Sequence, residues 1–148
     1  MHRLAEVQLL RGVDDASLDL ILGTGEILHI PSGDRLIEEG AVPSRLIVLL
    51  EGKLEVFVPD PAHRARGKRL ATINAGDSCG EYGFIDRRPA SASVKAVEDS
   101  KVFAITNKEF EIVMHGNREL ERTIYRNLLK TLVNRLRASN VVIDLLRS

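Results

Sequence analysis

The residues best suited to chemistry lie between positions 77 and 90, where the sequence shows no strand pattern. This segment opens with a glycine beside a carboxylate, Gly80-Glu81, and closes with the polar run 86–89, which includes Arg88. An ordered insertion between two strands, rich in glycine at its start, is where a β scaffold often carries its site. A carboxylate and a guanidinium are groups that hydrogen-bond to a ligand and pair with its charges. We therefore interpret this segment as a binding site.

No set of residues in the sequence supports a reaction. The four histidines are scattered, and no two of them have the spacing of metal ligands. The sequence contains no nucleophile elbow, P-loop or zinc motif. The adjacent carboxylates Glu38-Glu39 fall in a turn, where we expect them to be solvated. The sequence thus predicts no catalytic residue, no metal site, no cofactor and no enzymatic activity.

Composition and charge describe one ordinary globular domain. The 148 residues include 21 Lys and Arg and 21 Asp and Glu, so the net charge is zero and nothing global attracts nucleic acid. The single cysteine, Cys79, excludes a disulfide framework and a multi-cysteine metal site, and we expect it to be a small buried hydrophobe. With no signal peptide and no apolar run of bilayer length, a cytoplasmic protein without membrane contact is the default expectation.

Short β-rich runs separated by turn residues occupy the middle of the chain. The runs lie at 26–30, 35–38, 45–50, 53–58, 68–73, 91–97 and 101–105. Seven or eight short strands at regular spacing predict a mainly β fold, an eight-stranded β-roll or jelly-roll-like barrel. We expect a single domain over 1–148. It would consist of an N-terminal helical arm at 1–25, the roll at 26–105 and C-terminal helices at 106–148.

Capping signals mark the helices. Asp14 can cap a helix in the arm, the run 106–109 is a capping box, and Asn117 can cap a longer C-terminal helix. Apolar residues recur on that longer helix: Leu120, Ile124, Leu128, Leu132 and Leu136, with Tyr125, Leu129 and Val133 alongside. A face this broad predicts that one edge packs on the roll while another stays available for a partner helix.

Four cations are spaced four residues apart on the same helix: Arg118, Arg122, Arg126 and Lys130. Residues at this spacing share one helix face. Two interpretations stay open. The stripe is either a solvated face or an electrostatic docking strip for an acidic partner.

Several segments, taken in order and at their spacing, resemble one known family. These segments are Gly33-Asp34-Arg35-Leu36-Ile37, residues 38–40 and 46–56, Ala75-Gly76-Asp77-Ser78-Cys79-Gly80-Glu81, and Pro89-Ala90-Ser91-Ala92-Ser93-Val94-Lys95-Ala96. They resemble the cyclic-nucleotide-binding domains of catabolite-activator-type bacterial regulators, of regulatory subunits of cyclic-AMP-dependent protein kinase, and of gated channels. The resemblance implies a phosphate-binding cassette at 76–94 between two strands of the roll.

The resemblance also implies roles for individual residues. In the family, backbone N–H groups cradle the phosphate, a glutamate accepts from the ribose 2′-hydroxyl, and an arginine on the next strand pairs with the phosphate. The base stacks under a lid from the C-terminal helix. The implied ligand-binding residues are Gly80, Glu81, Tyr82, Arg88, Ala90 and Ser91. Ala90 occupies the arginine position, and Arg88 stands two residues upstream as a substitute.

Two functions follow as expectations. The replacement by Ala90 favours a regulatory module that is degenerate in phosphate recognition and signals through its C-terminal helix. The alternative is a working cyclic AMP or cyclic GMP sensor in which Arg88 supplies the cation. For partners we expect a homodimer through the 117–146 helix, and an effector protein. The family's DNA-reading domain would begin about where this chain stops, so we expect no DNA binding by this chain alone.

Overall fold

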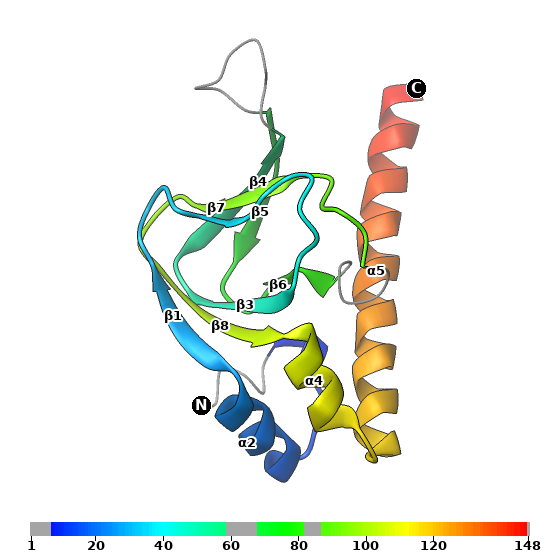
Figure 1. Cartoon of the computed structure of the whole chain (residues 1–148). Coiled ribbons are helices and arrows are strands. Elements are labelled where there is room, and N and C mark those ends of the chain that lie inside the picture. Colours follow the sequence, from blue (N-terminus) through cyan, green and yellow to red (C-terminus); the bar gives the residue numbers. More distant parts are fainter. Residues whose placement is uncertain (1–6, 59–67, 82–86, 148) are drawn as a thin grey trace.

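Eight strands in the described part of the chain form two four-stranded antiparallel sheets that pack against each other (Figure 1). The computed structural model describes residues 7–58, 68–81 and 87–147, with their side chains except those of Lys68 and residues 139–147. The strands are β1 (Glu26–Ile30), β2 (Arg35–Ile37), β3 (Arg45–Glu51), β4 (Lys53–Val58), β5 (Lys68–Asn74), β6 (Ser78–Cys79), β7 (Ser93–Ala96) and β8 (Ser100–Thr106). The helices are η1 (Gln8–Leu10), α2 (Asp15–Thr24), α4 (Asn107–Met114) and α5 (Arg118–Arg147).

The sheet topology confirms the predicted mainly β roll with flanking helices. One sheet has the strand order β1-β8-β3-β6 and the other β2-β7-β4-β5. One expectation is wrong, because the segment from 77 to 90 does contain a strand. β6 pairs Ser78 with Val48 and Cys79 with Ile47 at the edge of the first sheet. Two residues are too short to produce an alternating pattern, so sequence periodicity cannot reveal them.

The first sheet is buried on both faces, because alternate residues of its central strands enter two different cores. Along β3, Leu46 and Val48 pack in a cluster with the helices, while Ile47 and Leu49 pack in a cluster with the second sheet. Side chains on a strand alternate between faces, so one continuous apolar run can supply both clusters. This double burial fixes the register of β3 and with it the place where β6 pairs.

The helices begin where the sequence predicts. Thr106 Oγ1 accepts a hydrogen bond from the backbone N–H of Glu109, and the Glu109 carboxylate accepts from the N–H of Thr106, which completes a capping box. Asn117 Oδ1 accepts from the N–H of Leu120 at the start of α5. The Asp14 side chain caps α2. Because these caps satisfy N–H groups with no intrahelical partner, each helix has a defined start.

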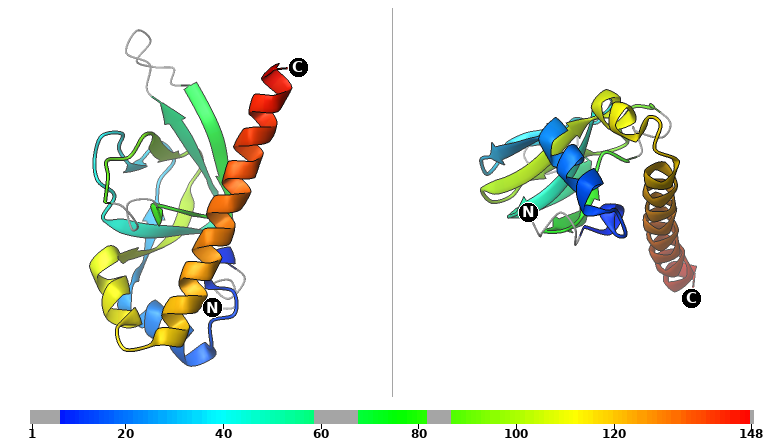
Figure 2. Two further views of the ribbon diagram at one scale, coloured as in Figure 1. Left: turned by 90° about the vertical axis from the view of Figure 1, so that its right-hand side faces the viewer. Right: turned by 90° about the horizontal axis from the view of Figure 1, so that it is seen from below.

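α5 lies along one side of the roll (Figures 1 and 2). Its residues Leu120, Ile124 and Leu128 are buried in the core cluster shared with the first sheet. The buried Asn127 side chain donates hydrogen bonds of 2.8 Å to the carbonyl oxygens of both Leu9 and Arg11. This amide therefore fixes the rotation of α5 against η1 and sets which helix face looks toward the cassette.

Replacing Asn127 with Ala leaves two carbonyl groups near η1 without their donor. We expect Asn127→Ala to lower the free energy of unfolding by about 1–3 kcal/mol, the usual effect of leaving buried polar groups unsatisfied. Chemical denaturation measures this difference. The control is Arg122→Ala on the exposed face of α5, which should change stability by no more than about 0.5 kcal/mol. Equal effects of the two substitutions would contradict the anchoring role.

Candidate functional site

The site begins where the chain leaves β6 and passes close to β3 at Gly80. The backbone of Gly80 has φ of 89°, in the left-handed region that favours glycine. A Cβ atom at this position would collide with the carbonyl oxygen of Arg45. Glycine is therefore required here both by the backbone conformation and by the close approach to β3. This turn delivers Glu81 to the interior.

Glu81 is a buried carboxylate whose two oxygens have different surroundings. Only 1% of the residue is exposed, and Oε1 accepts a hydrogen bond in an ion pair with Arg135 of α5. The second guanidinium nitrogen of Arg135 donates to the carbonyl oxygen of Ser78 at 3.0 Å. Oε2 is also buried and has no hydrogen-bond partner among the described residues. A ligand that donates a hydrogen bond to this buried acceptor lowers the free energy of the complex.

A cavity of about 880 Å³ lies beside this carboxylate. Its lining comes from the start and the end of the cassette, from β5, from loops of the second sheet and from α5. Glu81 and Cys79 lie on its wall, and Thr131, Asn134 and Arg135 face it from α5. The space is of the size that holds a small organic ligand. Its lining combines apolar side chains with polar and charged ones, Glu81 and Arg135 among them.

The structure brings most of the predicted site residues to this one cavity. Gly80, Glu81, Arg88, Ala90 and Ser91 all line it. Tyr82 lies outside the described residues. The predicted residues on either side of the gap therefore share one space, although the sequence separates them by up to eleven positions.

Ala90 presents no charge at the position that the resemblance assigns to the phosphate-binding arginine. Its backbone is held in strand-like pairing with the loop that follows β2. The Ala90 N–H donates to the oxygen of Ala41 at 2.8 Å, and the Gly40 N–H donates to the oxygen of Ala90 at 2.9 Å. This pairing makes position 90 a fixed part of the cavity wall that carries only a methyl group.

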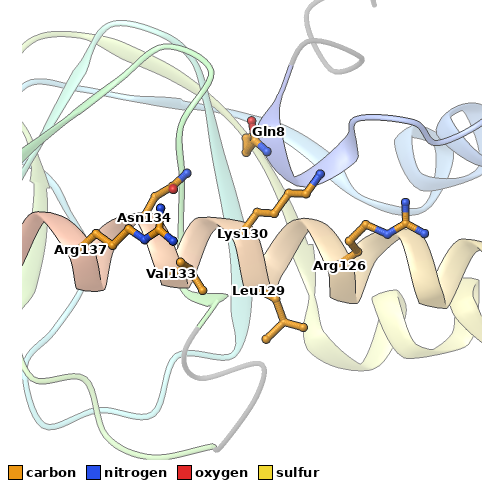
Figure 3. Close-up of a pocket in the computed structure, with 7 residues that line it drawn as sticks. All are labelled: Gln8, Arg126, Leu129, Lys130, Val133, Asn134 and Arg137. Carbon is orange, nitrogen blue, oxygen red and sulfur yellow. The ribbon is translucent and has the colours of Figure 1, made fainter.

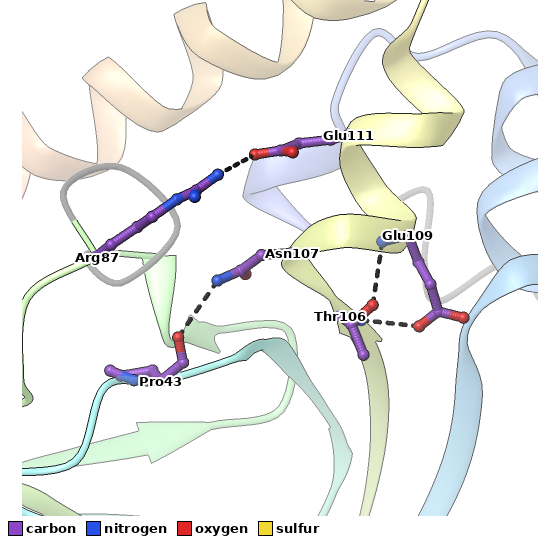
Figure 4. Close-up of polar contacts among 6 residues, drawn as sticks. All are labelled: Pro43, Arg87, Thr106, Asn107, Glu109 and Glu111. Atoms are coloured by element: carbon purple, nitrogen blue, oxygen red, sulfur yellow. Dashed lines mark hydrogen bonds and ion pairs between the residues drawn. The ribbon is translucent and has the colours of Figure 1, made fainter.

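The second half of the cassette contains a left-handed residue, Arg87, with φ of 55°. Its guanidinium pairs with Glu111 of α4 at 3.0 Å (Figure 4). The next residue, Arg88, is exposed and lines the cavity. In the same region Asn107 Nδ2 donates to the carbonyl oxygen of Pro43, another residue of the cavity wall (Figure 4). α4 therefore contacts both the cassette and the loop that carries Pro43.

The resemblance implied a lid from the C-terminal helix, but sequence reasoning did not identify the residues of α5 that reach the site. Arg135 lies 54 residues from Glu81, and no local pattern connects the two positions. A weak signal existed. Thr131 and Arg135 continue at i+4 from the buried Asn127, so they lie on the face that packs toward the roll. Polar residues on the otherwise apolar, roll-facing side of a helix point to a site.

Cys79 lies in the core cluster between the sheets, as a small buried residue should. Burial raises the pKa of its thiol well above the usual range. The neighbouring Glu81 carboxylate raises this pKa further, while Arg135 acts in the opposite direction. Because the thiolate is the reactive form of cysteine and is strongly disfavoured here, this thiol is unreactive. Among residues 7–58, 68–81 and 87–147, no group of three or more His, Cys, Asp or Glu is placed to hold a metal ion.

Comparison with known proteins identifies the family. The model of the cyclic nucleotide-binding domain matches residues 27–117. The chain therefore belongs to the cyclic-nucleotide-binding domain family, a family of regulatory modules that bind cyclic AMP or cyclic GMP. None of the helices in the described part of the chain is long and apolar enough to cross a bilayer.

Individual relatives agree with this assignment. The chain is 31% identical over 121 residues to the Pycsar effector protein XpPycTIR of Xanthomonas perforans, a match that covers 81% of this chain and 36% of that protein. It is 28% identical over 138 residues to the cyclic AMP receptor protein of Thermus thermophilus, covering 93% and 61%. The crystal structure of the Thermus thermophilus catabolite activator protein matches with a TM-score of 0.78 at 27% identity, covering 94% and 62%. The chain thus spans less than two thirds of each of these relatives.

Substitution of two glycines distinguishes the effect of a left-handed backbone from the effect of the close approach between Gly80 and β3. Gly76 and Gly80 both have left-handed φ angles, 96° and 89°, but a Cβ at Gly76 would meet no atom within 4 Å. Gly76→Ala should therefore lower the free energy of unfolding by about 1 kcal/mol, from the backbone alone. Gly80→Ala should lower it by at least about 1 kcal/mol more, since Arg45 must move. Chemical denaturation of both variants measures the difference, and equal losses would contradict the close approach.

Proposed function

We propose that this chain is a regulatory module that binds a ribose-bearing small ligand, with degenerate phosphate recognition, and that signals through α5. The observation that carries the proposal is the position of Glu81. This buried carboxylate lies on the wall of the cavity and is held by Arg135, a residue of the C-terminal helix. Ligand recognition and the position of α5 therefore meet at one side chain.

The ribose contact rests on the second oxygen of Glu81. Oε1 is occupied by Arg135, and Oε2 is buried without a partner among the described residues. A ribose 2′-hydroxyl is a donor of suitable size for such an acceptor, and a hydrogen bond to a charged group contributes about 1.5–3 kcal/mol. The hydroxyl would satisfy a group that is otherwise buried at a free-energy cost.

The phosphate contact is where we expect degeneracy. The wall at Ala90 offers a methyl group, and Arg135 is already engaged by Glu81 and by the Ser78 carbonyl. Without a fixed guanidinium fork, a phosphate loses about ten- to a hundredfold in affinity. The ligand therefore binds more weakly than in a site with the arginine.

Signalling through α5 follows from the Glu81–Arg135 pair. Among the described side chains of α5 beyond Leu128, only the partly buried Leu132 packs against the core cluster, while Leu129 and Leu136 are exposed. A ligand that changes the environment of Glu81 changes the interaction that holds this part of the helix. Such a ligand shifts the population of α5 positions by its difference in affinity for them.

A second candidate is a working cyclic-nucleotide sensor, which one observation favours. Arg88 lines the cavity from the second half of the cassette, so the wall includes an arginine although Ala90 carries no charge. In this candidate Arg88 pairs with the ligand phosphate, and binding is as tight as in a site with the usual arginine.

The predicted homodimer through the 117–146 helix stays a prediction, as do an effector partner and a cytoplasmic location. The exposed apolar residues Tyr125 and Leu136 on α5 support the homodimer, because a partner helix would bury them.

Calorimetric titration with cyclic AMP and cyclic GMP tests the proposal. We expect weak binding by the wild-type chain and a gain of about ten- to a hundredfold in Ala90→Arg, which restores the cation to an intact cavity. Arg88→Ala should have little effect on the wild-type affinity. The isosteric control Glu81→Gln in the Ala90→Arg background should abolish most of the gain, because a neutral amide replaces the charged acceptor.

Two results of the titration would contradict the proposed function. Micromolar binding by the wild-type chain that Arg88→Ala reduces at least about tenfold would replace the proposal with the sensor. Failure of Ala90→Arg to bind either nucleotide would show that the cavity does not accept a cyclic nucleotide at all.

A further inference from the structure

A shallow groove lies between η1 and the exposed side of α5, outside the ligand cavity. It measures about 360 Å³ and is lined by Gln8, Arg126, Leu129, Lys130, Val133, Asn134 and Arg137 (Figure 3). In Figure 3, Lys130 extends from α5 toward Gln8, while Leu129 projects from another side of the helix. The groove therefore combines a charged border with apolar side chains.

The charge of this groove is entirely positive. Arg126, Lys130 and Arg137 are exposed, and within the described part of the chain none of them has a carboxylate in ion-pair contact. The sequence from 122 to 143 contains no Asp or Glu. Uncompensated cations on one helix attract an acidic surface and speed its association.

The apolar side chains of the groove are also exposed to solvent. Leu129 is 63% exposed and Val133 is 43% exposed. They stand four residues apart, as do the two cations Arg126 and Lys130, so each pair forms a short row along α5. A partner that matches this surface must present apolar side chains beside carboxylates at helical spacing.

We propose that this groove docks an acidic amphipathic helix of a partner protein. A nucleic-acid backbone would pair with the cations but would leave Leu129 and Val133 without apolar contacts. A second copy of α5 carries the same cations along the same flank and brings no acidic residue between 122 and 143, so it matches the groove poorly. An acidic helix satisfies both the charge and the apolar surface.

The groove also adjoins the ligand cavity. Gln8 and Asn134 line both spaces, so a change of α5 position alters both together. We infer that occupancy of the cavity changes the affinity of the groove for its partner. This coupling rests on the proposed ligand-binding function, whereas the docking surface itself does not.

The probe is a synthetic acidic helix of roughly 18 residues, long enough to be helical, with Leu at i and i+4 and Glu on the flanking positions. Fluorescence anisotropy measures its binding to the full chain. We expect binding that weakens as salt is raised from about 50 to about 300 mM. The combined variant Arg126→Glu, Lys130→Glu and Arg137→Glu should weaken it at least about tenfold.

Matched controls isolate the groove. Arg118→Glu with Arg122→Glu changes two exposed cations of the same helix outside the groove, and should weaken binding by no more than about threefold. A combined Gln variant at Arg126, Lys130 and Arg137 removes charge without reversing it, and serves if the Glu variant unfolds. Leu129→Ser with Val133→Ser should also weaken binding, while a peptide with Lys in place of Glu should not bind.

Several results would overturn the docking surface. They are no binding of the acidic peptide, equal binding by the groove variants, tighter binding of a DNA oligonucleotide or of anionic vesicles, or a dimer in sedimentation that the groove variants dissociate. The coupling between the ligand cavity and the groove is tested separately in the Ala90→Arg variant. Nucleotide binding to this variant is measured first, and peptide affinity is then compared with and without nucleotide. If that variant binds cyclic AMP and peptide affinity stays unchanged, only the coupling is overturned.

Discussion

The buried carboxylate of Glu81 is the constraint on which the rest of this site depends. A carboxylate with 1% of its surface exposed is stable only when it is paired, and its partner Arg135 comes from a helix 54 residues further along the chain. The requirement to pair this charge therefore holds the C-terminal helix against the cassette. Everything that moves Glu81 acts on α5, and everything that moves α5 acts on Glu81.

The fold supplies the rigidity that this pairing needs. Double burial of the first sheet fixes the register of β3, and β3 in turn fixes the crossing of Gly80 that delivers Glu81 to the interior. From the other side, the Asn127 amide fixes the rotation of α5 against η1. Two independent anchors thus set the positions of the two members of one ion pair.

The fold followed from the sequence because its signals are local. Turn residues, alternation and caps such as Thr106 each act within a few positions, and they placed seven of the eight described strands and the starts of α2, α4 and α5. The short strand β6 was missed because two residues carry no period. The cassette side of the cavity was predictable from a linear motif, whereas Arg135 was not, because its role depends on how the helix packs. Nothing near Arg135 in the sequence encodes its contact with Glu81.

A double-mutant cycle on the free energy of unfolding tests the Glu81–Arg135 interaction most directly. The four proteins are the wild type, Glu81→Gln, Arg135→Met and the double variant, each measured by chemical denaturation without ligand. We expect a coupling of about 1–3 kcal/mol, with Arg135→Met more harmful when the carboxylate is present than when it is absent. A coupling of zero would show that Glu81 and Arg135 act independently, and would contradict the proposed link between the cavity and α5.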